Sequence, residues 1–103
     1  RAAKSTRTVV IAGVPDGLLR DDVMADILTI HFQKSGNNGG DVEEVTYPTG
    51  NKGVAYVTFE DQRVVESVLK KDDHRLEDKR LPQSYPLQVT PYCEKVSSCI
   101  SHL

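Results

Sequence analysis

Residues 52–59 read Lys-Gly-Val-Ala-Tyr-Val-Thr-Phe, and this octamer decides the fold. Successive side chains of a β-strand lie on opposite faces of its sheet. The octamer splits into two alternating sets, Gly53, Ala55, Val57 and Phe59 on one side and Lys52, Val54, Tyr56 and Thr58 on the other. We therefore expect a strand with one face in the core and one face open to solvent.

Further strands are expected before and after the octamer. Residues 8–13 are rich in β-branched side chains and end at a glycine, as a buried strand does. Residues 41–47 read as a second strand, irregular because Val42 and Val45 break strict alternation. Residues 85–90 form the last strand, and Pro86 within it favours a place at the edge of the sheet.

Two helices are expected between these strands. Downstream of Asp16, apolar residues recur at spacings of four, four and three, at Leu19, Val23, Ile27 and Ile30. Such spacing places them on one stripe of a helix, which ends near Ser35 before the loop 36–40. The second helix opens at Glu60 and Asp61 and buries Val64, Val65, Val68 and Leu69.

The resulting order is β-α-β-β-α-β, an α+β ferredoxin-like sandwich with a four-stranded antiparallel sheet and two helices on one face. We expect one domain over residues 8–92, with flexible flanks at 1–7 and 93–103, because 103 residues leave room for one core. Residues 72–84 are polar and long for a loop, and Leu76 and Leu81 are suited to anchor a short hairpin or turn there.

Charge argues against strong, nonspecific binding to nucleic acid. Thirteen basic and fifteen acidic residues give a formal net charge of −2, whereas domains that depend on phosphate contacts are usually basic. A basic cluster follows the second helix and consists of Lys70, Lys71, Arg75, Lys79 and Arg80. A solvated surface is the favoured interpretation of this cluster, and contact with RNA is the alternative.

Metal, cofactor and membrane binding are not expected. Cys93, Cys99 and His102 lie in a polar tail without a fourth ligand, in a spacing unlike common zinc sites. Two cysteines give no disulfide framework and favour an intracellular setting, with nucleus and cytoplasm both open. The apolar runs are far shorter than the ~20 residues of a membrane span. We expect a monomer.

Catalysis is not expected either. His31, near the first helix's apolar stripe, and His74, in a loop, have no serine, cysteine or carboxylate at a spacing typical of a triad, and both are interpreted as structural or exposed. Acylphosphatase-like enzymes share the topology but need a phosphate-cradling loop with an arginine after the first strand. Here that loop is 13–17, where the Asp16 carboxylate would repel phosphate.

The octamer resembles the conserved octamer of the RNA recognition motif, which it matches at six of seven defined positions. Residues 9–14 are similar to the family's first-strand hexamer but lack its aromatic residue and its asparagine. The runs 39–45, 47–49 and 52–57 are further similar to a divergent branch of the family. The resemblance extends over residues 8–92.

The resemblance implies an RNA-binding sheet with few stacking residues. The family's three base-stacking positions correspond to Val10, Val54 and Tyr56, and of these only Tyr56 carries a ring. Each missing ring removes roughly 1 to 3 kcal/mol of stacking, so two remove roughly 2 to 6 kcal/mol. We therefore expect weak binding of short single-stranded RNA on the open sheet face.

Other residues are expected to flank that surface. Lys52 occupies the octamer position that commonly meets a phosphate. Arg7 would contribute charge and Gln88 amide hydrogen bonds. Tyr92 is placed to fold back as a replacement stacking ring, although covering an apolar edge is the favoured interpretation of this residue.

A second function uses the same surface. Tyr56 is equally able to pack across the strands against Val10 and Val54, and the three side chains form an apolar patch. The alternative to RNA binding is therefore a protein-protein interaction module that has lost its stacking residues. The two functions differ in their response to salt, which weakens phosphate contacts.

Overall fold

The computed structural model describes residues 2–92. Its strands are β1 (Thr8–Ala12), β2 (Val42–Thr46), β3 (Val54–Phe59), β4 (His74–Leu76) and β5 (Tyr85–Pro91). Its helices are α1 (Asp21–Gln33) and α2 (Gln62–Lys70), with short 3-10 helices η1 (Lys4–Arg7) and η2 (Ser35–Asn37). The C-terminal flank 93–103, with Cys93, Cys99 and His102, lies outside the described residues.

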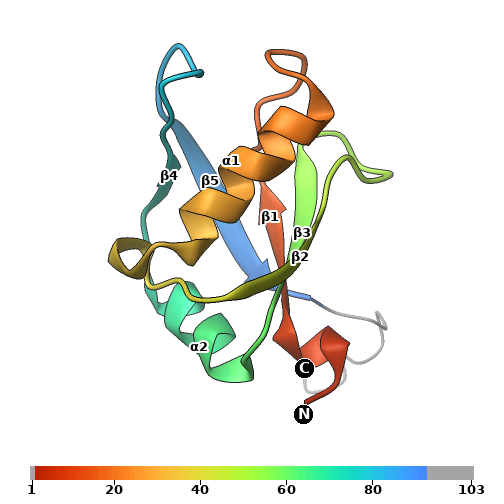
Figure 1. The fold of residues 1–103 in the computed structure, drawn as a ribbon, viewed down its shortest axis with the longest axis vertical. Coiled ribbons are helices and arrows are strands. Elements are labelled where there is room, and N and C mark those ends of the chain that lie inside the picture. Colours follow the sequence, from red (N-terminus) through yellow and green to blue (C-terminus); the bar gives the residue numbers. More distant parts are fainter. Residues whose placement is uncertain (1, 93–103) are drawn as a thin grey trace, which may run out of the picture.

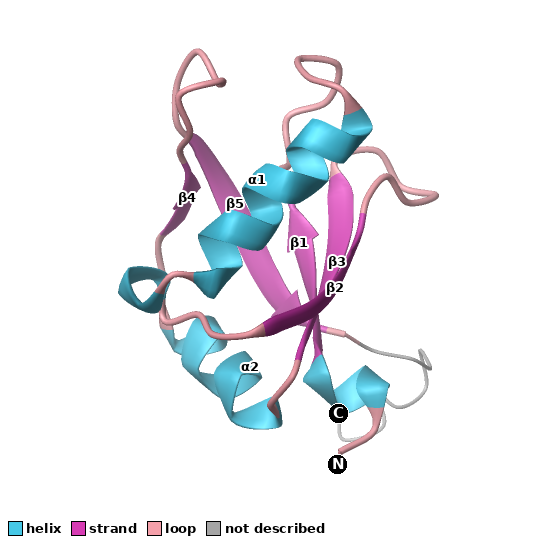
Figure 2. Cartoon of the chain, viewed as in Figure 1, coloured by secondary structure: helices cyan, strands magenta, loops and turns pink. Residues whose placement is uncertain are grey.

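The strands form one sheet in the order β2-β3-β1-β5-β4, with every neighbouring pair antiparallel. Both helices lie on one face of this twisted sheet, with α1 running obliquely across it (Figures 1 and 2). The ferredoxin-like α+β sandwich expected from the sequence is thus confirmed. Its other face has no α-helix of the described chain over it.

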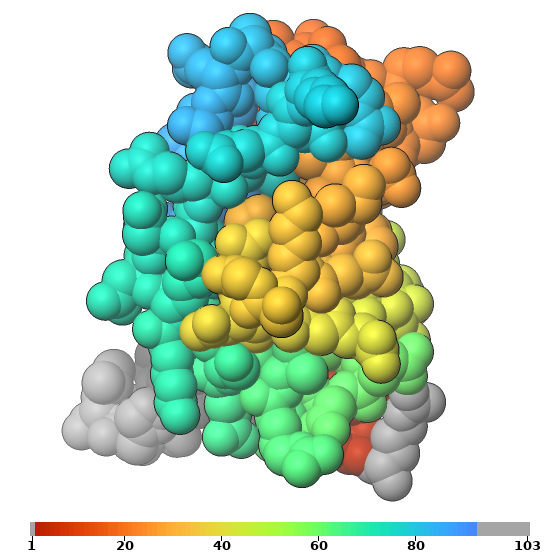
Figure 3. Space-filling view, turned by 60° about the vertical axis from the view of Figure 1, so that its left-hand side comes forward, coloured from red at the N-terminus to blue at the C-terminus, as the bar shows by residue number. Residues whose placement is uncertain are grey.

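The sheet has five strands where four were expected. The additional strand, β4, pairs with the start of β5 and lies in the polar segment 72–84, where a short hairpin was predicted. It was hard to recognise because it has three residues, of which only His74 and Leu76 are buried. Figure 3 shows this segment, in teal, beside the end of α1 and the η2 turn, in yellow.

β5 is not a simple edge strand, contrary to the expectation drawn from Pro86. Residues 88–91 pair with β1, and residues 85–87 pair with β4. Pro86 lies beyond the stretch that pairs with β1, so a missing amide there interrupts no hydrogen bond to that strand. The irregularity predicted for the second strand is confirmed, since the pairing of β2 with β3 shifts register between Val42 and Glu44.

The alternation of the octamer is confirmed for residues 54–57 and 59, but Thr58, on the side expected to be open, is only 3% exposed because η1 packs at that end of the strand. Ala55, Val57 and Phe59 are completely buried against the helices, whereas Val54 and Tyr56 are only partly covered. Gly53 comes just before the strand with φ +73°, a conformation that residues with a side chain rarely adopt. The strand therefore begins at Val54, two residues later than the octamer.

The stripe predicted for α1 is partly wrong. Ile27 is buried, but Ile30 is 38% exposed. The helix begins at Asp21 rather than soon after Asp16, and its true stripe follows the i, i+3, i+4, i+7 rule from Met24. The buried members of α1 are Met24, Ile27, Leu28, His31 and Phe32. The polar side chain of His31 hid this stripe in the sequence.

Candidate nucleic-acid interface

The face of the sheet opposite the helices presents a regular grid of side chains, which we call the open face. Strand pairing places Thr46, Tyr56, Val10 and Thr90 in one row across β2, β3, β1 and β5. A second row, one step along the strands, holds Glu44, Thr58 and Thr8. A third, one step the other way, holds Val54, Ala12 and Gln88. Five of the seven predicted binding residues are on this face or beside it: Val10, Val54, Tyr56, Gln88 and Tyr92.

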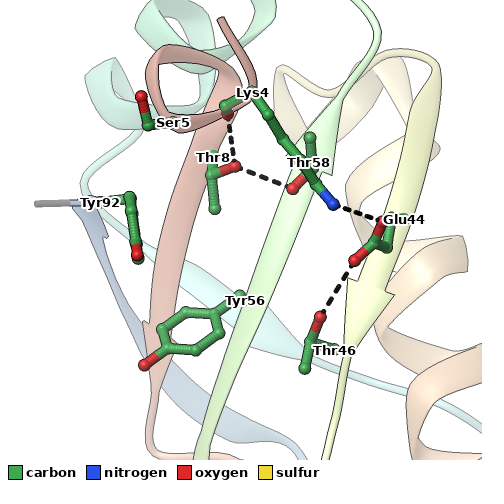
Figure 4. Close-up of a pocket in the computed structure, with 8 residues that line it drawn as sticks. All are labelled: Lys4, Ser5, Thr8, Glu44, Thr46, Tyr56, Thr58 and Tyr92. Carbon is green, nitrogen blue, oxygen red and sulfur yellow. Dashed lines mark hydrogen bonds and ion pairs between the residues drawn. The ribbon is translucent and has the colours of Figure 1, made fainter. Parts of the chain in front are cut away.

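Tyr56 lies at the centre of the grid, and Tyr92 stands beside it. Their ring centroids are 5.6 Å apart and their planes meet at 83°, an edge-to-face arrangement. Tyr92 is held there because its backbone N–H donates to the Thr8 carbonyl at 3.1 Å, which prolongs the pairing of β5 with β1. In Figure 4 the Tyr56 ring is seen nearly face-on and Tyr92 nearly edge-on. Tyr56 thus offers a ring face, and Tyr92 forms a wall at its side.

A hollow of about 280 Å³ adjoins the two rings (Figure 4). Its floor is formed by Thr8 and Thr58, whose hydroxyl groups are 2.8 Å apart. Thr8 donates its hydroxyl hydrogen to the Lys4 carbonyl at 2.7 Å, so the Thr58 hydroxyl donates to Thr8. These bonds join η1 to the sheet and make Lys4 and Ser5 one wall of the hollow.

The side of the hollow formed by β2 carries charge, and the Lys4 side chain reaches across to it. Lys4 Nζ donates to Glu44 Oε1 at 2.7 Å, and Thr46 Oγ1 donates to Glu44 Oε2 at 3.4 Å. None of these three residues was predicted to contribute to the binding surface. The register shift in β2 hid the direction in which Glu44 and Thr46 point, and the lead before β1 was expected to be flexible.

Lys52 lies in the turn before β3 and is 82% exposed. Its ammonium is 3.7 Å from the carboxylate of Asp16, in the loop after β1. Exposed ion pairs of this kind contribute about 0 to 1 kcal/mol, so the pair with Asp16 holds Lys52 only weakly. Gln88 is exposed on the open face, in one row with Ala12 and Val54.

Arg7 is placed apart from the open face, although the sequence suggested it as a flanking cation. It is only 5% exposed, and its Nη1 donates to the Phe59 carbonyl at 2.7 Å and to Glu43 Oε1 at 2.6 Å. Its Nε donates to the Ala2 carbonyl at 2.9 Å. Arg7 therefore fastens η1 to the ends of β2 and β3, in a lead that was expected to be flexible.

His31 and His74 meet on the helix side of the sheet. Since the Val68 carbonyl can only accept, His74 donates to it through Nε2 and accepts from His31 Nε2 at 3.1 Å through Nδ1. His31 Nδ1 is 3.3 Å from the Asn37 side-chain amide, which donates to it. Both rings are buried. Burial first, then the electrostatic influence of His74 and the positive charges of Lys34 and Lys71, lower the pKa of His31 to about 4.

Residues 2–92 offer no group of three or more histidine, cysteine, aspartate or glutamate side chains that is arranged to hold a metal. None of the helices described is long and apolar enough to cross a membrane. The basic cluster is largely exposed, and two of its arginines pair with nearby aspartates: Arg75 with Asp73, and Arg80 with Asp78.

One comparison with known proteins bears on the identity of the chain. The family model for the third RNA recognition motif domain of PARP14 matches residues 6–100 of the 103. The finer similarity of residues 39–45, 47–49 and 52–57 to the divergent motif of RNA-binding protein 43 stays a prediction. With the fold, the octamer on β3 and a match over almost the whole chain, the protein belongs to the RNA recognition motif family, whose members are in general RNA-binding modules.

Proposed function

We propose that the domain binds short single-stranded RNA weakly on the open face, with Tyr56 as the stacking residue. The observation that carries this proposal is the Tyr56 ring, which lies at the centre of the open face with Tyr92 standing against it. Unstacked bases pair readily with aromatic rings, and every base has a π-face, so such contact tolerates many sequences. Domains of this family are in general not enzymes, and the function proposed here is binding alone.

Flanking groups add hydrogen bonds and charge to this surface. Val10 and Val54 provide apolar contact beside the ring, and Gln88 provides an amide one row away. Lys52 reaches a phosphate if it leaves Asp16. Arg7 is not part of the proposed contact, because its guanidinium is buried and engaged with Phe59 and Glu43.

Two features support weak binding. Two family stacking positions hold valines, and Tyr92 replaces them only in part because it stands upright beside Tyr56. The cations nearest the open face, Lys4 and Lys52, each have a carboxylate partner that competes with phosphate. With about two phosphate contacts on a single strand, log Kobs should fall with log salt at a slope of about −1.4.

The second candidate function is binding of a protein partner to the same apolar patch. Val10, Val54 and Tyr56 lie together in adjacent rows, and such a patch suits a protein surface as well as a base. A partner of this kind would dock with little dependence on salt, whereas RNA binding should show the slope given above.

Affinity measurements with variants of Tyr56 test the proposal. Fluorescence anisotropy with a labelled mixed-sequence RNA octamer should show that Tyr56→Ala weakens binding about 5- to 150-fold, the loss of one stacked base. Tyr56→Phe keeps the ring and should bind within about twofold of the unmodified domain. Ile30→Ala, on the exposed side of α1, is the control for loss of an apolar side chain elsewhere.

Binding that is unchanged in Tyr56→Ala would overturn this use of the ring. Absence of RNA binding at any salt concentration, with the domain folded, would make the protein-interaction module the better conclusion.

A further inference from the structure

The hollow beside Tyr56 contains a charged pair that a platform for any base does not need. Its floor and one end are neutral, formed by threonine hydroxyl groups and tyrosine rings. Its wall along β2, in contrast, holds the Glu44 carboxylate, which the Lys4 ammonium reaches from η1 at 2.7 Å. A carboxylate on an RNA-binding surface repels phosphate, so Glu44 is not suited to contact the RNA backbone and needs another role.

Glu44 is within reach of a base that is stacked on Tyr56. Thr46 is the direct neighbour of Tyr56 across β2 and β3, and Glu44 is two residues before it on the same strand. Residues two apart in a strand are about 6.8 Å apart, close to the width of a base. A base lying flat on the ring would therefore direct one edge into the hollow, toward Glu44.

Glu44 and Lys4 have hydrogen-bonding sites left over after they bond to each other. Each carboxylate oxygen has two acceptor sites, and in this structure Oε1 receives a hydrogen bond from Lys4 and Oε2 a long one from Thr46. A lysine ammonium has three donors, of which one is directed at Glu44. The wall thus presents two acceptors beside a donor.

From this geometry, and resting on the proposed RNA binding, we infer that the hollow selects guanine. The Watson-Crick edge of guanine carries two adjacent donors, N1–H and N2–H, next to the O6 acceptor. The donors match the Glu44 carboxylate and O6 matches the Lys4 ammonium. Adenine and cytosine offer one amino donor each, and uracil offers one donor between two acceptors that repel a carboxylate. The volume of about 280 Å³ suits one base rather than a longer segment.

Titrations with oligomers that differ in one base test the inference. Calorimetry with oligouridine, and with oligouridine carrying one central guanine, should show about tenfold tighter binding of the guanine oligomer, since a bidentate contact of this kind discriminates by that order. Central adenine or cytosine should fall between the two. Glu44→Gln should reduce the guanine preference to about twofold or less.

The ratio of affinities for the guanine and uridine oligomers, rather than either affinity alone, should be compared between variants. Glu44→Gln removes a negative charge and therefore strengthens binding to every RNA. Glu66→Gln is the matched control: Glu66 is exposed on α2, on the other side of the sheet, and its loss should leave the tenfold preference unchanged.

The outcomes separate this inference from the proposed function. Equal binding of all four oligomers, abolished by Tyr56→Ala, would overturn guanine selection and leave RNA binding standing. A guanine preference that survives in Glu44→Gln would overturn the role of Glu44. If no oligomer binds, both the inference and the proposed function are overturned, and a protein partner becomes the occupant of the open face.

Discussion

The two faces of β3 carry side chains of similar size under opposite constraints. Phe59, on the covered face, is completely buried and packs edge-to-face against Phe32 at a centroid distance of 6.2 Å. Tyr56, three residues earlier on the open face, is only partly covered and has Tyr92 at its side. A buried ring is fixed by the fold, whereas a partly open ring is available to a ligand. The comparison suggests that stability and binding are separable along one strand.

The same contrast exists between cations. Arg7 is buried by η1 and bonded to a carbonyl and a carboxylate, whereas Lys52 extends into solvent with one loose partner. Net charge alone cannot distinguish these roles. The burial of each group decides which cation stabilises the fold and which remains exposed to solvent.

The largest expected effect separates the two aromatic residues. Phe59→Ala should lower the free energy of unfolding by about 3–5 kcal/mol, because it removes a completely buried ring. Tyr56→Ala should lower it by about 1 kcal/mol or less, since the ring is partly in solvent. Urea unfolding measures both, and Phe59→Leu keeps the comparison measurable if the alanine variant does not fold. Equal losses would contradict the division between the faces.

Acid should destabilise the covered side through His31. Its pKa is about 4 in the folded domain against 6.5 as the ordinary value, so the unfolded chain binds the proton more readily. The contribution of neutral His31 to the free energy of unfolding is therefore fully present above about pH 6.5. It is lost as the pH falls from there through the folded pKa near 4, a loss of up to about 3 kcal/mol. Urea unfolding at pH 7.5, 5.5 and 4.5 measures this loss.

A second variant makes the assignment specific. His31→Gln can still donate to His74 but does not titrate, so its loss of stability over this pH range should be smaller. The hydrogen bonds from Arg63 and Arg80 hold the pKa of Asp61 and Asp78 at about 2, so these carboxylates lose their contribution only at lower pH. An equally steep fall in His31→Gln would show that another group is responsible.

The smallest effects distinguish the two cations. Arg7→Ala should cost about 1.5–3 kcal/mol of stability, the range for hydrogen bonds to a charged group, without weakening RNA binding once the domain is folded. Lys52→Ala should change stability by less than about 0.5 kcal/mol and weaken RNA binding a few-fold. Thermal unfolding and anisotropy on both variants measure the contrast. Reversal of the two patterns would contradict it.

The covered face was largely predictable because burial imposes a period on the sequence. Alternation in residues 54–57 and the spacing of Val65 and Val68 in α2 indicate which side chains enter the core, although Val64 and Leu69, also expected there, are only partly buried. The exceptions have identifiable causes. His31 is polar and broke the apparent stripe of α1, and three residues are too few to show the alternation of β4.

The open face was predictable where a strand or a family position could be counted along the chain, as for Tyr56, Val10 and Gln88. Glu44 and Thr46 follow a register shift in β2, so their direction could not be derived from counting along the chain. Lys4 reaches Glu44 from 40 residues away in sequence, through a short helix held by Arg7. Such contacts depend on tertiary packing, so they cannot be predicted from local sequence patterns.

Amide NMR spectra recorded during titration with a short single-stranded RNA test the central claim most directly, because they locate binding on one face of the sheet. We expect shifts that cluster on Val10, Val54, Tyr56 and Tyr92, with residues of α1 and α2 unchanged. Shifts confined to the helices, or no shifts at millimolar RNA, would contradict RNA binding on the open face.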